Sequence, residues 1–566
     1  MSVTEEIKVR EKQSTELVKV SEEVVSRPNK LVAWFEENKS LLIRVFVVTI
    51  ILGLMGNAFG YFNLNLDNDF LLEYKISHLH KIRLGRFLQP VVRYILGGVI
   101  VLPWVEGIVF LFFTGCTVFL ICKVFHYQKL LPIIITAGLF TNNLWVIFIT
   151  SSCLHDLSSY ALAMFLAVLA FSYYVKHKDH LRIDKIVLIS LMVICSAALY
   201  QAYLSVTVTL IIIHSIVSLF NGGDFKKEIK SLLIIFTVIG IASILYYLDA
   251  HCVAYLCNVD LNDPNEHVPL RNLQYPLDIL QRIPSAYVEV FKGLFFSVST
   301  LPKSVFYGTS VFINVLNWVL LIFALLVVVN AIIQRKIKVQ NLILCLILFL
   351  LLPLAMGCIY VFTGMIRILY FSYILYYIFL LEMFKLSDRL TTNKFFDLQK
   401  IVKFVSLGML FVIASNIQLA NTAYAKKDLQ QQAVLSVMTR VVDKIESMPG
   451  YVTGETKVIF IGYITNNNYW YPSLTNDDNA GVNLVANIAG MSDFTIWNYL
   501  HYIRYVLNNN MNCYTYSFNS KTYGLSDLEN DFSREQIEMI NEMPSFPNGD
   551  YVQKINNIVV VKLSNI

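Results

Sequence analysis

The stretch from residue 311 to residue 362 reads VFINVLNWVLLIFALLVVVNAII, then QRKIKV, then QNLILCLILFLLLPLAMGCIYVF. Each outer run is long enough to cross a bilayer core of about 30 Å as a helix, which takes about 20 apolar residues. The connector carries Arg335, Lys336 and Lys338, and basic short loops are typical of the cytoplasmic side of a membrane. This stretch therefore predicts two membrane-spanning helices joined by a short inside loop.

Apolar runs of this length recur along most of the chain, and we predict about eleven spanning helices in all. The run 186–220 is too long for one span and contains the polar break Tyr200-Gln201-Ala202-Tyr203, so we divide it into a tight hairpin. The predicted spans are residues 41–62, 104–122, 130–150, 158–175, 186–200, 204–220, 231–248, 311–333, 340–362, 366–384 and 401–418.

The composition agrees with a membrane protein, because 56% of the 566 residues are hydrophobic, 15% are charged and the mean hydropathy is +0.58. Soluble globular chains have about 45–50% apolar and about 25% charged residues. The net charge of +5 is small for this length, which argues against a nucleic-acid-binding protein. The sequence has no phosphate loop, HExxH, nucleophile elbow or CxxC pair, and this argues against ATP hydrolysis and metalloprotease chemistry.

The orientation follows from the basic residues of the short loops. With the N-terminus in the cytoplasm, every predicted inside loop is basic, whereas the outside turns 151–157 and 201–203 carry no Lys or Arg. Residues 63–103 then lie outside as helices at the membrane surface, with Pro90 and Pro103 as breaks. The inside loops carry Lys123, Lys129, Lys176, Lys178, Arg182, Lys185, Lys226, Lys227, Lys230, Arg335, Lys336, Lys338, Lys385, Arg389, Lys394 and Lys400.

The chain divides into a cytoplasmic N-terminal segment, 1–40, a transmembrane domain, 41–420, and an outside domain, 421–566. Residues 1–40 are too charged for a cleavable signal peptide. The outside domain has the pattern of a small α/β fold. We predict helices at 421–448 and 494–508 and strands at 457–463 and 557–563. The predicted fold class is thus an all-α polytopic membrane protein with a small C-terminal α/β domain.

Two carboxylates, Asp67 and Asp69, follow the first span within a polar cluster. In an extended loop they point the same way because they are two residues apart. A positioned carboxylate can take a proton from an attacking sugar hydroxyl. Two carboxylates can instead hold a divalent cation, or they can form a solvated cap on the first helix. All three roles are compatible with the sequence.

Basic residues follow on the same predicted outside segment, where the charge rule disfavours them. They include Lys81, Arg83 and Arg86. The planar fork of arginine binds phosphate oxygens in pairs, so a phosphate group would explain these residues. Contact with anionic lipid headgroups is the alternative.

Three further polar residues lie at the outside ends of predicted spans: Asp156, Gln201 and Arg367. Each alone suits a helix cap, a hairpin turn or an arginine that reaches the interface. Together with Asp69 and Arg86 they place carboxylates and arginines on one membrane face. That combination favours group transfer from a lipid-linked phosphate.

At these residues the chain resembles the bacterial membrane glucosyltransferases that phage use for O-antigen serotype conversion, and their Gram-positive relatives. The resemblance runs along nearly the whole chain after residue 40. It rests on Asp67-Asn68-Asp69, Gly85-Arg86-Phe87, the turn around Asp156, Tyr200-Gln201-Ala202-Tyr203 and the segment 421–440. A Trp would be expected after Gly-Arg, where this chain has Phe87.

The resemblance implies a GT-C type fold in the bacterial cytoplasmic membrane. It implies transfer of a sugar, typically glucose, from undecaprenyl phosphate to a surface glycan on the outer face, with inversion. A synthase and a flippase for the lipid-linked donor are the implied partners. On this hypothesis Asp69 or Asp67 is the general base, Arg86 and Arg367 neutralise the phosphate with Arg83 nearby, and Asp156 and Gln201 orient sugar hydroxyls. A divalent cation on the two aspartates remains open.

Three other functions fit part of the pattern. A transporter or flippase of lipid-linked sugars needs a polar path across the bilayer, yet charges in the middle of the predicted spans are nearly absent. A glycan polymerase or ligase would use the same face and similar arginines, but it normally has a large outside loop between late spans, whereas the largest loop here, 249–310, comes earlier. A scaffold for the outside domain would not need about eleven spans.

Overall fold

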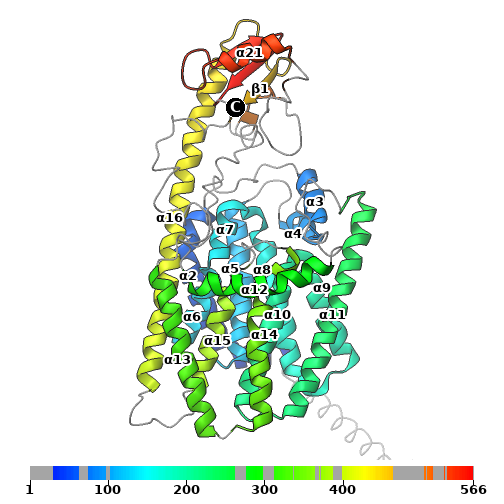
Figure 1. The fold of residues 1–566 in the computed structure, drawn as a ribbon, viewed down its shortest axis with the longest axis vertical. Helices are drawn as coiled ribbons and strands as arrows, with labels where there is room; N and C mark the ends of the chain where they lie inside the picture. The colour runs from blue at the N-terminus through cyan, green and yellow to red at the C-terminus, as the bar shows by residue number, and fades with distance from the viewer. Residues whose placement is uncertain are drawn as a thin grey trace, which may run out of the picture.

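The computed structural model is a bundle of long helices that run side by side, with a small α/β domain carried beyond one end by the helix α16 (Figure 1). We call the end of the bundle nearest this domain the upper end and the opposite end the lower end, as they stand in Figure 1. The structure describes residues 30–62, 74–96, 102–261, 276–296, 311–335, 337–363, 369, 371–386, 398–462, 503–504, 507–513, 528 and 532–564.

Nine stretches of the described chain are long and apolar enough to cross a membrane. The helices of the bundle and its upper end are α2 (Lys30–Tyr61), α3 (Tyr74–Arg83), α4 (Gln89–Leu96), α5 (Pro103–Val124), α6 (Leu130–Thr141), α7 (Leu144–Ser152), α8 (Leu157–His177), α9 (Ile183–Tyr200), α10 (Leu204–Phe220), α11 (Phe225–Leu256), α12 (Pro276–Phe295), α13 (Val311–Arg335), α14 (Val339–Thr363), α15 (Tyr373–Lys385) and α16 (Leu398–Glu446). Short 3₁₀ turns, η2 (Leu154–Asp156), η3 (Lys178–His180) and η4 (Gln201–Tyr203), join some of them.

One of the nine stretches, 183–220, reverses direction at η4, as the sequence predicts. The Ser196 hydroxyl on α9 donates to the Ala163 carbonyl, and the Thr207 hydroxyl on α10 donates to the Ala167 carbonyl. Helix α9 therefore runs toward the upper end beside α8, and α10 returns toward the lower end beside the same helix. This hairpin adds a tenth passage through the bundle.

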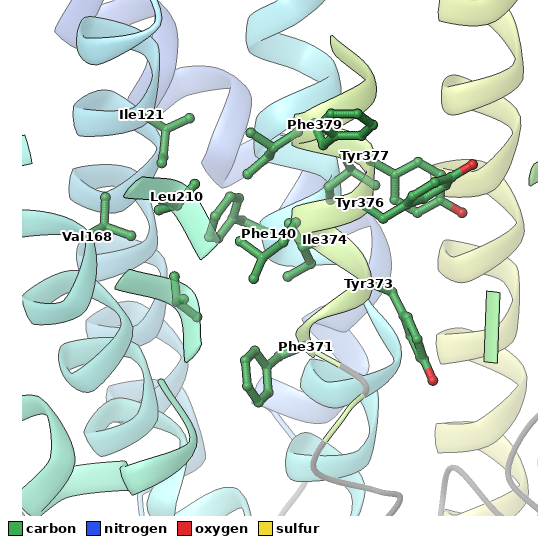
Figure 2. Close-up of a cluster of buried hydrophobic side chains, with 14 of the residues drawn as sticks. Ile121, Phe140, Val168, Leu210, Phe371, Tyr373, Ile374, Tyr376, Tyr377 and Phe379 are labelled. Atoms are coloured by element: carbon green, nitrogen blue, oxygen red, sulfur yellow. The ribbon is translucent and has the colours of Figure 1, made fainter. Parts of the chain in front are cut away.

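Helix α15 supplies an eleventh passage although its described part is short. At the upper end the Phe371 ring lies 4.9 Å from the ring of Tyr203. At the lower end Lys385 donates to the Phe125 carbonyl. Every residue from Tyr373 to Phe384 is buried. Figure 2 shows its tyrosines pointing away from Phe140 and Leu210, so that α15 packs against helices on both sides and occupies the centre of the bundle.

The short helices predicted at the membrane surface are present as α3 and α4 at the upper end (Figure 1). Pro90 lies in the first turn of α4 and Pro103 starts α5, where proline loses no hydrogen bond. Helix α2 begins at Lys30 and continues through the first span without a break. The predicted domain boundary at residue 40 thus falls inside one helix.

The C-terminal domain contains a four-stranded sheet in the order β2-β1-β4-β3. The predicted strands 457–463 and 557–563 are present as β1 (Lys457–Ile461) and β4 (Ile558–Lys562), which pair in parallel. The predicted helix 421–448 is the upper part of α16, whereas 494–508 lies mostly outside the described residues. The remaining elements are β2 (Asn512–Cys513), β3 (Val552–Ile555) and α21 (Arg534–Glu542).

A buried polar network joins α2 to the break between α6 and α7 and to α16. Asn57 donates to the Thr141 carbonyl at 2.9 Å and accepts from the Tyr424 hydroxyl at 2.6 Å. Asn142 donates to the Leu52 carbonyl at 2.9 Å. The side chain of Asn142 lies against Gly56, where a Cβ would come within 1.7 Å of its Oδ1. Gly56 thus permits close packing between α2 and the break between α6 and α7.

We expect Gly56→Ala to destabilise the protein by about 1–3 kcal/mol, because the new methyl group displaces a hydrogen-bonded amide. The matched control is Gly240→Ala, since no atom lies within 4 Å of a Cβ at that helical position. Thermal unfolding in detergent compares the two variants. Equal melting temperatures would contradict the packing role of Gly56.

Candidate active site

A glycine-closed turn between α3 and α4 sets the position of Arg86. Gly85 has φ +76°, a conformation that only glycine adopts without strain. Its amide donates to the Ile82 carbonyl at 2.8 Å, and the Arg86 amide donates to the Lys81 carbonyl at 2.8 Å. These two bonds form a Schellman motif at the end of α3. The Gly-Arg order therefore fixes where the arginine leaves the helix.

Three hydrogen bonds tie this turn to the hairpin α9–η4–α10 and to α11. The side-chain amide of Gln201 donates to the Leu84 carbonyl. The Tyr246 hydroxyl donates to the Gly85 carbonyl at 3.0 Å. The Leu88 amide donates to the Ala198 carbonyl at 3.2 Å. Gln201, predicted to orient sugar hydroxyls, uses its amide nitrogen to position the arginine turn.

The Arg86 guanidinium lies against two tyrosines of the bundle. Its Nη1 donates to the Tyr160 hydroxyl at 2.9 Å, and its Cζ lies 4.9 Å from the centre of the Tyr200 ring. Burial lowers the pKa of Arg86, but Tyr160, Tyr200 and Asp156 raise it, and the net shift is upward. Its Nε is buried and has no hydrogen-bond partner among the described residues. The site thus holds a charged guanidinium with an unused donor.

Asp156 lies beside this arginine, with 3% of its surface exposed. Its Oδ2 accepts from Lys81 Nζ and from the Tyr160 hydroxyl, the latter at 3.4 Å. His155 Nε2 lies 3.5 Å from Asp156 Oδ1. A carboxylate surrounded by cations stays ionised and holds its neighbours in place, which makes it a poor proton acceptor. In this arrangement Asp156 positions Lys81 and Tyr160.

Aromatic rings line the bundle next to Arg86. Tyr200 stacks on Trp145 with ring centres 5.4 Å apart and meets Tyr160 edge-on at 4.6 Å. Trp145 Nε1 donates to the Tyr203 hydroxyl at 3.0 Å. The Tyr200 hydroxyl is buried without a hydrogen-bond partner in the described part of the chain. These rings are buried and pack on one another, and they form a rigid wall against the guanidinium.

The structure brings together three of the predicted site residues, Arg86, Asp156 and Gln201, at the upper end. Arg83 is the last residue of α3, one turn before Arg86. Asp67, Asp69 and Arg367 lie outside the described residues. Within the described ranges, no three His, Cys, Asp or Glu side chains form a cluster that could hold a metal ion. The divalent cation on Asp67 and Asp69 therefore stays a prediction.

Sequence analysis missed Tyr160 and Glu106 as members of the site. Glu106 is 6% exposed, and its Oε2 accepts from the Ser158 amide at 2.9 Å. It thus caps the first turn of α8 next to Asp156, where a negative charge is favourable. The available signal was a lone acidic residue inside an otherwise apolar predicted span. Tyr160 gave no such signal, because one tyrosine in an apolar span is ordinary.

The family model for glucosyl transferase GtrII matches residues 56–383, more than half of the chain. The chain belongs to the GtrII glucosyl transferase family. This confirms the resemblance to serotype-converting glucosyltransferases. The match includes every site residue predicted from sequence and ends before α16 and the C-terminal domain. No curated protein and no solved structure matches the chain.

We expect Asp156→Asn to destabilise this glucosyl transferase by about 3–5 kcal/mol, because it leaves the buried Lys81 ammonium without its counter-charge. The double variant Asp156→Asn/Lys81→Met should recover part of that loss. Unfolding by denaturant in detergent measures both. The same cycle on the exposed pair Lys185–Asp184, 3.0 Å apart, should show no measurable coupling. Additive losses at Lys81 and Asp156 would contradict the ion pair.

We expect Gly85→Ala to lower the rate of glucosyl transfer by about tenfold or more, because it moves the Arg86 turn. The control is Gly222→Ala at the lower end, which also has positive φ (+88°) and open space around it. Both variants should lose about 1–2 kcal/mol of stability from backbone strain. Equal transfer rates in the two variants would show that the turn does not orient the arginine.

Proposed function

We propose that this glucosyl transferase moves glucose from undecaprenyl-phosphate-glucose to a surface glycan on the outer face of the bacterial cytoplasmic membrane, with inversion at the anomeric carbon. In this proposal the N-terminus is inside, and the upper end and the C-terminal domain are outside. The donor would be supplied by a separate synthase and flippase. The apolar helices and the family membership support a membrane glucosyltransferase. The identity of the lipid carrier and the membrane face on which the enzyme acts are the parts that we propose here.

One observation carries the choice of a lipid-linked phosphate donor. The Gly85 turn positions Arg86 at the upper end of an apolar bundle, where its neighbours favour the charged guanidinium. The buried Nε of this arginine has no hydrogen-bond partner among the described residues. A buried donor without a partner costs free energy unless something binds it. A phosphate oxygen is the acceptor that a guanidinium fork fits best. A polyprenyl phosphate brings that oxygen to the end of a membrane helix bundle.

The proposed reaction is a single displacement. The acceptor hydroxyl oxygen attacks the anomeric carbon of glucose while the bond from that carbon to the phosphate oxygen breaks. The proton of the hydroxyl passes to Asp69, or to Asp67. The electron pair of the broken bond leaves on the phosphate, where Arg86, Arg83 and Arg367 would neutralise the developing charge. Attack opposite the leaving group inverts the configuration.

The described contacts support this division of roles. Asp156 is fully engaged by Lys81, Tyr160 and His155, so the base must come from another carboxylate. Asp67 and Asp69, which follow the first span, are the candidates that the sequence predicts. Tyr160 and Tyr200 hold the Arg86 guanidinium in place. The C-terminal domain would help to hold the acceptor glycan through Tyr469, Trp470 and Tyr471, which lie outside the described residues.

The test uses the purified full-length chain in lipid nanodiscs with undecaprenyl-phosphate-glucose and cell-envelope glycan. We expect wild type to release undecaprenyl phosphate. Asp69→Asn or Asp67→Asn should lower the rate by about a hundredfold or more, as for loss of a general base. Arg86→Ala should lower it strongly and Arg86→Lys partly, because lysine keeps the charge without the fork.

Arg182→Ala is the matched control, since that arginine is 81% exposed at the lower end and should leave the rate unchanged. Release that survives both aspartate substitutions would remove the base assignment. Absence of release with every acceptor, together with passage of lipid-linked glucose across the bilayer, would contradict the transferase and favour a transporter.

A further inference from the structure

A second polar cavity lies at the lower end of the bundle, opposite the Arg86 site. Its volume is about 340 Å³. We call it the lower cavity and define it by its seven polar lining residues, which lie on α10, on α15, on η3 and in the segments that follow α5 and α10. They are His126, Lys178, His214, Ser218, Asn221, Glu382 and Lys385. The helices α5, α8, α10 and α15 each start at the upper end and finish here.

One of the two lysines in the lower cavity is fixed by a neighbouring carboxylate. Lys178 donates to Glu228 Oε1 at 2.7 Å, and the Ser218 hydroxyl donates to the same oxygen at 2.5 Å. The charge of Glu228 is thereby balanced inside the protein. This pair orders one wall of the cavity and adds no net charge to it.

The second lysine is less fully paired. Lys385 donates to the Phe125 carbonyl, and its Nζ lies 5.4 Å from the centre of the Tyr127 ring. Glu382 Oε1 is 4.0 Å away, which is an ion pair but too long for a hydrogen bond. An ammonium group has three donors, and one bond to a carbonyl leaves capacity for an anion that enters the cavity.

Two buried polar atoms of the lining residues have no hydrogen-bond partner within the part of the chain that the structure describes. They are Glu382 Oε1 and His214 Nδ1. A buried carboxylate oxygen without a donor is costly, and Lys385 does not reach it. The Tyr127 hydroxyl also faces the Glu382 carboxylate, but it completes no hydrogen bond with Oε1, so a hydroxyl of a ligand can donate to this oxygen. A bare phosphate would leave this oxygen unpaired and add a like charge beside it.

The remaining wall is apolar and aromatic. Val124, Phe125 and Val217 line it, and the Phe125 ring lies 6.5 Å from the His214 ring. His126 stands at the exposed rim in a left-handed conformation, φ +55°. Non-glycine residues adopt this conformation rarely, most often in turns. The cavity thus combines a cationic side, an acceptor in need of a donor, and an apolar wall.

We propose that the lower cavity binds the headgroup of a membrane lipid in which a phosphate diester carries a polyol. The phosphate contacts Lys385, a hydroxyl of the polyol donates to Glu382, and the lipid chains leave between the helix ends. A glycerol headgroup and a polyprenyl-phosphate-linked hexose share this chemistry. The site is separate from the Arg86 site and does not depend on the proposed reaction.

Native mass spectrometry of the full-length chain in detergent tests this proposal without any variant. The probes are phosphatidylglycerol, phosphatidic acid and phosphatidylcholine with identical chains, and undecaprenyl-phosphate-glucose. We expect phosphatidylglycerol to bind at least about fivefold more tightly than phosphatidic acid, since its glycerol hydroxyl can donate to Glu382. Equal binding of all four lipids would overturn the proposal. Preference for phosphatidic acid would reduce the site to an anion site and overturn it as well.

Variants then locate the binding. Lys385→Met should weaken phosphatidylglycerol binding, and Glu382→Gln should remove its advantage over phosphatidic acid. Lys176→Met is the matched control on α8, because that lysine is exposed and does not line the cavity. Arg86→Ala should leave the preference for phosphatidylglycerol intact, which separates this site from the proposed active site, and binding of the glucose lipid to the lower cavity is measured in that variant. A preference that survives both cavity substitutions would place the lipid elsewhere and overturn the assignment.

Discussion

The reversal of the chain at Gln201–Tyr203 is the feature on which the upper end of the bundle depends. It sends α9 and α10 along the same neighbour, α8, and leaves Gln201 at the tip. From there the Gln201 amide holds the Leu84 carbonyl, and with it the turn that carries Arg86. Tyr200, just before the reversal, places its ring beside the guanidinium, and Tyr203 packs edge-on against Tyr200. A short polar break in an apolar run thus determines both a change of direction and the contents of the site.

Much of the bundle could be predicted from the sequence because a bilayer permits few backbone arrangements. Every peptide group in the apolar region must be paired within a helix, so length and hydropathy locate most spans. The basic loops then show which helix ends lie on the same side of the membrane. The hairpin at Tyr200–Tyr203 and the shared end of Arg86, Asp156 and Gln201 followed from that pattern. The pairing of Lys81 with Asp156 did not, because it depends on how α3 packs over η2 and α8. The spacing of apolar residues along the chain does not show how these elements pack on one another.

The C-terminal domain shows the complementary case. The two longest strands, β1 and β4, were predicted from their apolar runs, whereas the short β3 and the helix α21 were not. Helix α21 does carry a local signal, the capping box between Ser533 and Gln536, which is readable in the sequence. The single helix α16 was predicted as two elements because its hydropathy falls after the span. Yet no proline or glycine lies between Gly408 and Pro449, so nothing local ends the helix where the span ends.

In the proposed function the Arg86 turn binds the phosphate of a lipid-linked sugar. A cryo-electron microscopy structure of the full-length chain with undecaprenyl-phosphate-glucose in a nanodisc tests this role. We expect a donor phosphate within hydrogen-bonding distance of the Arg86 guanidinium. A donor phosphate bound away from Arg86, with the guanidinium still held only by Tyr160, would contradict it.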